Sequence, residues 1–408
     1  MPLDRLSRVL DAHVVGLEKA GTAKGTEHVV VGVEPPRGDR GPRFRLAGQG
    51  DREFIRMNSN SYMGLGLHPE VMAAEERGTR AFGAGPGAVR FISGTYQAHV
   101  DLESRLAAFH GREAAMVFSS AYATIVSTLV PLVTADTVLI SDELNHNCII
   151  NTMRLARPAG KDVYRHLDLA QLDEQLGAWK GKAKRAVVVT DGIFSMRGDH
   201  APLDRIVEVC RRHDAGYEEN VVLVVDDSHG VGALGPTGRG TEEYTGSPPV
   251  DILVGTLGKA FGVNGGYVTG NASTVRFLRE SSMMYIYSNP ITVGEAAAAL
   301  RSLEIVDSPE GLERLRRLRS LTKRFEEGLG RVGIETIPGE HPVVPMMIRD
   351  TQKTRDLVRH LFENGVLVTG LAFPVVPRGD EEIRTQVNAD HTEADIDHVL
   401  GLLSKYKA

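Results

Sequence analysis

The first residues that suggest chemistry are an acid and an imidazole at the end of an apolar segment. Asp226 ends VVLVVD, and His229 follows three residues later in DDSHG. Five apolar residues precede Asp226, so we expect its carboxylate at the end of a buried strand, where a charge needs a cationic partner. A protonated pyridine nitrogen is one such cation. The ordinary alternatives are a turn cap or an arginine partner.

A lysine follows the next apolar segment. Lys259 lies in GTLGKAFG, between Gly258 and Gly262 and shortly after Thr256. The glycines allow the backbone to approach a ligand closely. Desolvation in such a turn favours the neutral amine, which suits a lysine that forms a Schiff base with a carbonyl group. A single lysine at a strand end is more often a solvated surface group. The series of acid, imidazole and amine is more specific than any one member.

Two further segments suit a ligand that has a phosphate and a planar ring. FSSAYAT follows one apolar run and begins a helical segment, so its free backbone N–H groups could hold a phosphate. Ser119, Ser120 and Thr124 could add hydroxyl donors, although a simple N-cap would explain one of them. His146 follows Asp142 in SDELNHNC, where its ring could stack on a planar group. Alternatively, it is a loop histidine bonded to its neighbours.

These residues lie in a region of alternating strand and helix patterns. The apolar runs there are five to eight residues long, which is typical of strands buried on both faces: AAMVFSSA, DTVLISD, AVVVTDG, VVLVVDD and DILVGTL. Helical spacing separates them, as in LDLAQLDEQLGAWKG and LDRIVEVCRRHDAG. The pattern predicts an α/β fold with a mostly parallel sheet covered by helices. Ligands of such sheets bind at the carboxyl ends of the strands.

Changes in composition and in hydrophobic pattern along the chain suggest three regions. Residues 1–50 form an N-terminal arm, residues 51–290 a large domain with the sheet, and residues 291–408 a smaller C-terminal α+β domain. The arm begins with an amphipathic helix, which we expect to pack on its own chain or on a partner. The apolar stripe of this helix comprises Leu3, Leu6, Leu10 and Val14.

Composition excludes several classes of protein. The 408 residues carry a formal net charge of -6, and the chain has no basic patch of the kind that binds nucleic acid. The sequence contains no run of 18 apolar residues, so we expect no membrane span. The charged opening segment lacks the apolar core of a signal peptide. Two cysteines, Cys148 and Cys210, fit a reducing compartment. We therefore expect a cytoplasmic protein, and no cluster suggests a metal site.

Five motifs resemble those of one enzyme family in order and spacing. DDSH, TDGIFSMRGD, DELNHNC, GTLGKAFG and IRTQVNADHT are similar to segments of the α-oxoamine synthases, which are pyridoxal 5'-phosphate (PLP) enzymes of fold type I. The similarity extends from NSNSYMGLGLHP to the C-terminus. Among the members, the chain looks most like glycine C-acetyltransferase, also called 2-amino-3-ketobutyrate CoA ligase, in segments such as VRFISGT, YIYSNP and FPVVPRG. The resemblance implies the PLP-dependent transferase fold of type I.

The resemblance implies a role for each residue around the cofactor ring. Lys259 would form the Schiff base with PLP and later act as the base. Asp226 would pair with the pyridine nitrogen, and His146 would stack on the ring. His229 and Ser195 would approach the phenolic oxygen, although Ser195 could instead cap a helix.

The family pattern also implies contacts to the phosphate and to the substrate. The residues implied for the phosphate are Ser120, Ala121, Tyr122 and Thr256, with Ser288 or Asn289 reaching across from the other subunit of a homodimer. Arg384, helped by Asn60, would bind the carboxylate of the substrate, for which its planar fork is suited. A surface ion pair is the alternative for Arg384, and a turn is the alternative for Asn60.

The implied reaction joins a small amino acid, glycine first, to an acyl thioester such as acetyl-CoA or another short acyl-CoA. The Claisen-type condensation gives a 2-amino-3-oxo acid, or an α-amino ketone if CO2 leaves. One alternative is a biosynthetic α-oxoamine synthase that uses another amino acid or a carrier-protein thioester. An aminotransferase and a non-catalytic PLP-binding module are further alternatives.

Overall fold

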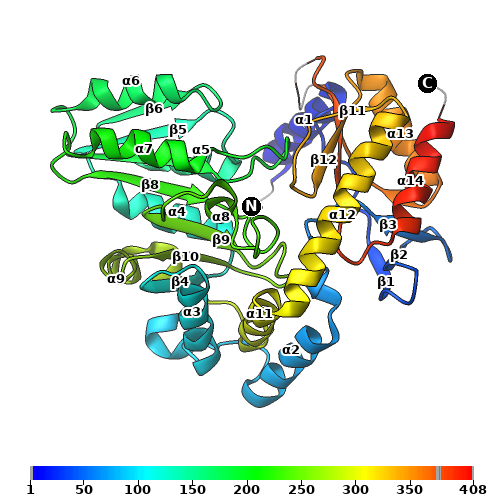
Figure 1. Cartoon of the computed structure of the whole chain (residues 1–408), viewed down its shortest axis with the longest axis horizontal. Helices are drawn as coiled ribbons and strands as arrows, with labels where there is room; N and C mark the ends of the chain where they lie inside the picture. Colours follow the sequence, from blue (N-terminus) through cyan, green and yellow to red (C-terminus); the bar gives the residue numbers. More distant parts are fainter. Residues whose placement is uncertain (1–2, 374–375, 377, 407–408) are drawn as a thin grey trace. The chain divides into compact units, whose positions relative to one another are not determined.

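The computed structural model describes residues 3–373, 376 and 378–406, and its contacts divide the chain into two compact units (Figure 1). The larger unit comprises Asn60–Arg319 and Glu340–Pro342. The smaller unit comprises Met1–Ser59, Ser320–Gly339 and Val343–Ala408. Each unit is described separately below.

A seven-stranded sheet forms the centre of the larger unit. Its strands, in spatial order, are β4 (Ala114–Phe118), β10 (Gly266–Gly270), β9 (Ile252–Thr256), β8 (Val221–Asp226), β7 (Arg185–Asp191), β5 (Thr137–Asp142) and β6 (Gly160–Tyr164). The neighbours from β9 to β6 pair in parallel, whereas β10 is antiparallel to both β4 and β9. The five expected strands are all present, so the prediction of a mostly parallel sheet is confirmed.

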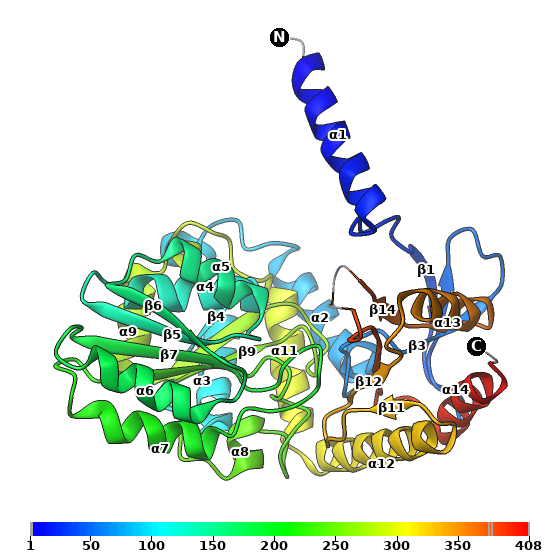
Figure 2. The same ribbon diagram turned by 90° about the horizontal axis from the view of Figure 1, so that it is seen from above.

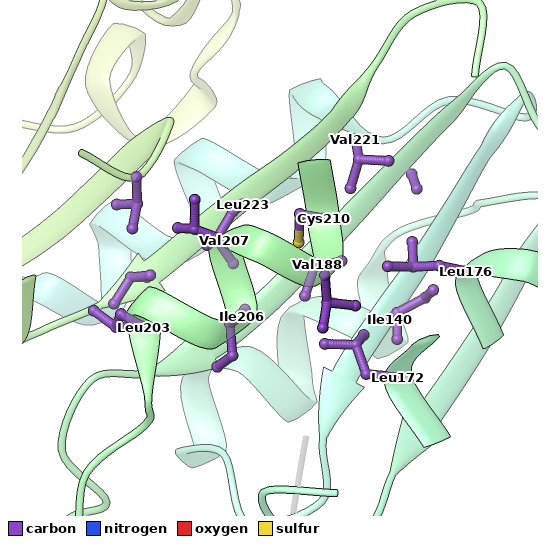
Figure 3. Close-up of a cluster of buried hydrophobic side chains, with 14 of the residues drawn as sticks. Ile140, Leu172, Leu176, Val188, Leu203, Ile206, Val207, Cys210, Val221 and Leu223 are labelled. Atoms are coloured by element: carbon purple, nitrogen blue, oxygen red, sulfur yellow. The ribbon is translucent and has the colours of Figure 1, made fainter. Parts of the chain in front are cut away.

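Helices cover both faces of this sheet, as Figure 2 shows from above. They include α3 (Gln97–Phe109), α4 (Ala121–Leu132), α5 (Asn147–Leu155), α6 (Leu169–Trp179), α7 (Leu203–Asp214) and α9 (Ala272–Ser281). Successive strand residues point to opposite faces. Val188 therefore joins the core beneath α6 and α7, which Figure 3 shows, whereas Val187 joins the core beneath α4 and α5. Each such buried side chain stabilises the fold by about 1.5–3 kcal/mol.

The larger unit has further helices, and the last two of them lie past the expected domain boundary at residue 290. They are η1 (Leu65–Leu67), α2 (Pro69–Phe82), the π-helical turn η2 (Arg90–Gly94), α8 (Thr241–Thr245), α10 (Met283–Ile286), α11 (Val293–Val306) and the first half of α12 (Pro309–Arg331). The alanine-rich α11 packs against α2 and α3. The contacts consequently divide the chain within α12, at Arg319, rather than near residue 290, where the texture of the sequence changes.

Besides the N-terminal helix described below, two small sheets and three helical segments build the smaller unit. One sheet has the order β1 (Val30–Glu34), β2 (Arg43–Leu46), β3 (Glu53–Arg56) and β13 (Val366–Leu367). The other has the order β11 (Glu335–Thr336), β12 (Val343–Met347), β15 (Glu382–Gln386) and β14 (Thr369–Leu371). The helical segments are the end of α12, α13 (Thr351–Glu363) and α14 (Glu393–Lys405). Within FPVVPRG, residues Pro374, Val375 and Pro377 lie outside the described residues.

The apolar stripe of the N-terminal helix α1 (Asp4–Ala20) is exposed to solvent. The helix forms as its sequence predicts, but none of its residues is buried. Leu3 is 66% exposed and Val14 is 49% exposed, so the stripe does not pack on its own chain in this structure. None of the helices in the described ranges has the length and apolar character needed to cross a membrane. Cys148 and Cys210 are both free thiols in buried positions.

Candidate functional site

A cavity in the larger unit lies at the carboxyl ends of the central strands, where ligands of parallel sheets bind. Its lining residues come from the ends of β7 and β8 and from the segments that follow β4, β5, β8 and β9: Ala121, Tyr122, His146, Cys148, Asp191, Asp226, Ser228, His229 and Lys259. The four side chains expected to be catalytic are all among them. Cys148, Asp191 and Ser228 line the cavity without having been assigned a role from the sequence.

Asp226 is one of two buried acids of this cavity. It ends β8, and in register it lies opposite Asp191 of β7. One carboxylate oxygen accepts the backbone N–H of Ser228 at 3.1 Å, and the other accepts the thiol of Cys148 at 3.6 Å. Neither contact supplies a positive charge. A buried carboxylate placed in this way suits the cationic ring nitrogen that the sequence suggested.

The neighbouring acid, Asp191, has a different electrostatic character. Burial raises the pKa of Asp191 well above its usual value, and the charge of Asp226 raises it further. Its Oδ2 accepts the backbone N–H of His146 at 2.9 Å. Asp191 therefore holds a proton more readily than an ordinary carboxyl group, and its contact with His146 fixes the start of α5. Its position at the end of AVVVTDG was the signal that could have identified it.

His146 is the N-cap residue of α5. Its Nδ1 accepts the backbone N–H of Cys148 at 3.2 Å and lies 3.0 Å from the sulfur of that residue. Desolvation lowers the pKa of His146, and this effect outweighs the attraction of Asp226 for its protonated form. The neutral, flat imidazole at the cavity wall suits stacking on an aromatic ring.

Residues distant in the sequence hold His229 in place. The hydroxyl of Tyr62 lies 2.7 Å from Nδ1 of His229 and 3.1 Å from Oδ1 of Asn60. Nε2 of His341 lies 2.9 Å from the carbonyl oxygen of His229. Tyr62 and His341 were not identified from the sequence, although Tyr62 lies in NSNSYMGL, the segment that contains Asn60. Asn60, expected to help bind substrate, is thus linked to His229 through one tyrosine.

Lys259 enters the cavity from a tight turn after β9 and is partly buried. Gly262 in this turn has a φ of 71°, in the left-handed region that favours glycine. A Cβ at this position would also lie 2.2 Å from the backbone nitrogen of Gly66. The turn that presents the amine therefore requires glycine at 262.

The first turn of α4 offers donors for a phosphate. Ser120 is the N-cap, and its Oγ accepts the backbone N–H of Ala123 at 3.1 Å. The backbone N–H groups of Ala121 and Tyr122 precede this capped position, and both residues line the cavity. The first N–H groups of a helix have no partner within the helix and attract anions. Gly266 of β10 allows the close approach, because a Cβ there would lie 2.3 Å from the nitrogen of Ala121.

Two hydroxyl groups near this turn already donate to the backbone. Thr124 donates to the carbonyl oxygen of Ser120 at 2.9 Å. Thr256 donates to the carbonyl oxygen of Gly265 at 3.2 Å and accepts the N–H of Gly258. In this arrangement the backbone N–H groups, rather than these hydroxyls, are the donors available to a phosphate.

Four other expected site residues are not among those that line the cavity. Ser195 lies in the loop after β7 and is partly buried, and Ser288 and Asn289 follow α10. Arg384 lies in the smaller unit, in the middle of β15, where it is opposite Pro345 of β12. Its partial burial agrees with the expectation from the sequence.

Known proteins are similar to this chain along almost all of its length. The family model described as aminotransferase class I and II matches residues 52–403. An 8-amino-7-oxononanoate synthase of Symbiobacterium thermophilum is 40% identical over 355 residues, which cover 87% of this chain and 88% of the relative. A mitochondrial 2-amino-3-ketobutyrate coenzyme A ligase of Homo sapiens is 36% identical over 397 residues, which cover 97% and 90%.

Solved structures agree with these matches. A Sphingomonas wittichii serine palmitoyltransferase superimposes with a TM-score of 0.87 at 26% identity, covering 99% of this chain and 97% of the other. The cavity offers an acid for a ring nitrogen, a flat imidazole, a lysine amine and helix N–H groups for a phosphate, so its residues fit PLP. The chain belongs to the α-oxoamine synthases, the fold-type I PLP enzymes that condense an amino acid with an acyl-CoA.

Proposed function

We propose that the protein joins glycine, or another small amino acid, to a short acyl-CoA such as acetyl-CoA. The convergence of Lys259, Asp226, His229 and His146 on one cavity carries this proposal. The choice of substrates is supported by the relative named 2-amino-3-ketobutyrate coenzyme A ligase, which matches 97% of the chain.

Each cavity residue has a task in this reaction. When bound, PLP supplies an electron sink for the bonds at Cα of the amino acid. Asp226 keeps a proton on the ring nitrogen, because its negative charge stabilises the protonated form. Lys259 holds the cofactor and takes the proton from Cα of the substrate. His146 would stack on the ring, and His229, which Tyr62 contacts, would hold the phenolic oxygen.

The substrate carboxylate requires a cation, and we assign this task to Arg384. Its guanidinium can donate two parallel hydrogen bonds to a carboxylate, which fixes the orientation of the Cα–H bond. Asn60 is assigned a supporting contact. The condensation then joins Cα to the acyl carbon of the thioester and releases the thiol. The product is a 2-amino-3-oxo acid when the carboxylate stays, or an α-amino ketone when CO2 leaves.

A second candidate substrate pair follows from the other relatives. The 8-amino-7-oxononanoate synthase of Symbiobacterium thermophilum is 40% identical, slightly more than the coenzyme A ligase of Homo sapiens at 36%. The higher identity to the synthase supports the alternative proposal. In that case the protein is a biosynthetic enzyme that uses another amino acid, or a longer or carrier-bound acyl group.

A thiol-release screen tests these proposals. We expect glycine with acetyl-CoA to release free CoA, detected with a thiol reagent, at a rate at least about tenfold above that with longer acyl-CoAs or bulkier amino acids. Each substrate alone provides the control. Release only with a longer acyl group or with a carrier-protein thioester would favour the second candidate. Accumulation of the amine form of the cofactor with amino acid alone would indicate an aminotransferase, and no release with any pair would indicate a non-catalytic module.

We also propose that the protein is a homodimer. Exposed apolar side chains occur on two adjoining elements of the larger unit: Phe91 and Ile92 on η2, and Met283 on α10, followed by Tyr287. Ser288 and Asn289 lie next to this surface and are assigned to the phosphate of the neighbouring subunit. The open stripe of α1 supports the same proposal. Light scattering on the purified protein should give twice the chain mass of 44.3 kDa, whereas the mass of one chain would contradict the proposal.

A further inference from the structure

His166 joins two loops that carry proposed site residues. It lies in the loop between β6 and α6, and its ring contacts a carboxylate on each side. Nδ1 lies 3.1 Å from Oδ1 of Asp142, the last residue of β5. Nε2 lies 3.2 Å from Oδ2 of Asp199, in the loop that follows β7. The edge of the ring packs against Phe194 of that same loop, with ring centroids 4.4 Å apart at an interplanar angle of 87°.

Asp142 links His166 to the loop that carries His146, because its carboxylate contacts both. Its Oδ1 also accepts the backbone N–H of Leu144 at 2.8 Å, two residues before His146. Its Oδ2 accepts the N–H of Leu167 at 2.9 Å. Leu167 adopts a φ of 59°, which is uncommon and costly for a residue other than glycine. The surrounding contacts therefore hold this segment in one conformation.

Asp199 transmits the contact to the loop that carries Ser195. Its backbone carbonyl oxygen accepts the N–H of Phe194 at 3.0 Å, which closes the turn around Ser195. Its Oδ2 also accepts the Nε–H of Arg197 at 2.9 Å. The orientation of Ser195 thus depends on where Asp199 is held.

The charge on the imidazole follows from the geometry. A carboxylate can only accept hydrogen bonds, so contacts to two carboxylates require an N–H group on both ring nitrogens. Only the protonated imidazole has both. A neutral ring can donate to Asp142 or to Asp199, but not to both.

We propose that His166 is a positioning residue, which as an imidazolium ties the loop of His146 to the loop of Ser195. The inference rests on the proposed roles of these two residues at the cofactor. His166 does not line the cavity itself. It acts on the site by fixing the two loops that hold the stacking imidazole and the hydroxyl near the phenolic oxygen.

The contact should be lost at alkaline pH. Burial disfavours the charged ring, but the hydrogen bonds and charges of Asp142 and Asp199 outweigh this effect and raise the pKa of His166 to about 9. The raised pKa means that the tie is complete below pH 6.5 and weakens as the pH rises through about 9. The charged groups around the ring are Asp142 of β5, Glu143 beside the N–H of His166, Asp199 and Arg197 of the loop after β7, and Arg165 and Asp168 of its own loop.

Hydrogen exchange of the full-length holoenzyme tests the tie directly. We expect the amide protection of residues 192–200, corrected for the intrinsic rate, to fall about tenfold between pH 7.5 and pH 10, the effect of one lost charge-assisted hydrogen bond. In His166→Gln, whose neutral amide cannot donate to both acids in this way, protection should be low at both pH values. Equal protection at both pH values in the natural protein would overturn the proposal.

Asp199→Asn provides the matched control. The amide nitrogen introduced at position 199 can donate to Nε2 of a neutral His166, with loss of the bond from Arg197 to the same atom, while Nδ1–H still donates to Asp142. This variant should keep the protection of residues 192–200 up to pH 10. A fall in Asp199→Asn equal to that of the natural protein would show that another group titrates and would refute the assignment.

A spectral titration separates this inference from the proposed function. The absorbance and circular dichroism of the bound cofactor should shift with pH near 9 in the natural protein and not in Asp199→Asn. If exchange responds as expected but the cofactor spectrum does not, His166 ties the loops and the roles given to His146 and Ser195 fail. If neither responds, the positioning role itself is wrong.

Discussion

Replacement of Lys259 by alanine is expected to lower turnover by at least about 10³-fold and to abolish covalent attachment of the cofactor. The amine lies in the same cavity as Asp226 and His146, whose pKa is affected by the charges of both groups. No other lysine lines this cavity within the described part of the chain. Alanine removes both the group that binds the cofactor and the group that takes the Cα proton. Borohydride reduction followed by peptide mass mapping measures the attachment, and thiol release measures turnover.

Two further variants make the result specific to residue 259. Lys259→Arg keeps a positive charge, but a guanidinium neither forms the covalent bond nor accepts a proton near neutral pH. It should therefore fail as completely as alanine. Lys161→Ala removes an exposed lysine on β6 and should leave both measurements unchanged. Normal labelling of the protein in Lys259→Ala would refute the central assignment of the site.

Most strands of the central sheet could be predicted because a strand that is buried on both faces has a nearly continuous apolar sequence. VVLVVD and AVVVTD are almost entirely apolar, and each ends in an acid where the chain leaves the core. Two strands have no such apolar run. β6 lies at the edge of the sheet and alternates between partly buried and exposed residues up to its buried last residue, and β10 is the glycine-rich GYVTG. The antiparallel direction of β10 follows from its partners rather than from its own residues.

The residues that support the site could not be predicted for a related reason. Asp226, His229 and Lys259 follow strands of one sheet, so the fold alone brings them together. Tyr62 reaches His229 across 167 positions in the sequence, and no local pattern indicates such a contact. Hydroxyl groups were also ambiguous. Thr124 was expected as a possible phosphate donor, but its hydroxyl donates within α4, as threonines in helices often do.

Asp226 and Asp191 form a natural pair for testing the electrostatics of the cavity. They lie opposite each other on β8 and β7, and both are buried. We expect Asp226→Asn to lower turnover by about 10³-fold, because a neutral amide does not keep the ring nitrogen protonated. A charge pair near 4 Å contributes about 4 kcal/mol at an effective dielectric constant of 20, and each 1.36 kcal/mol is tenfold in rate.

Asp191→Asn should cost less than about tenfold in turnover. Burial and the neighbouring charge raise the pKa of Asp191 and so favour its neutral form, which an amide resembles in charge. The amide oxygen can still accept the N–H of His146. The pH profile provides a second measurement. Asp226→Asn should alter the absorbance of the bound cofactor between pH 6 and pH 9, whereas Asp191→Asn should follow the natural protein. Equal losses in the two variants would mean that the acids share one proton and that the charge does not reside on Asp226 alone.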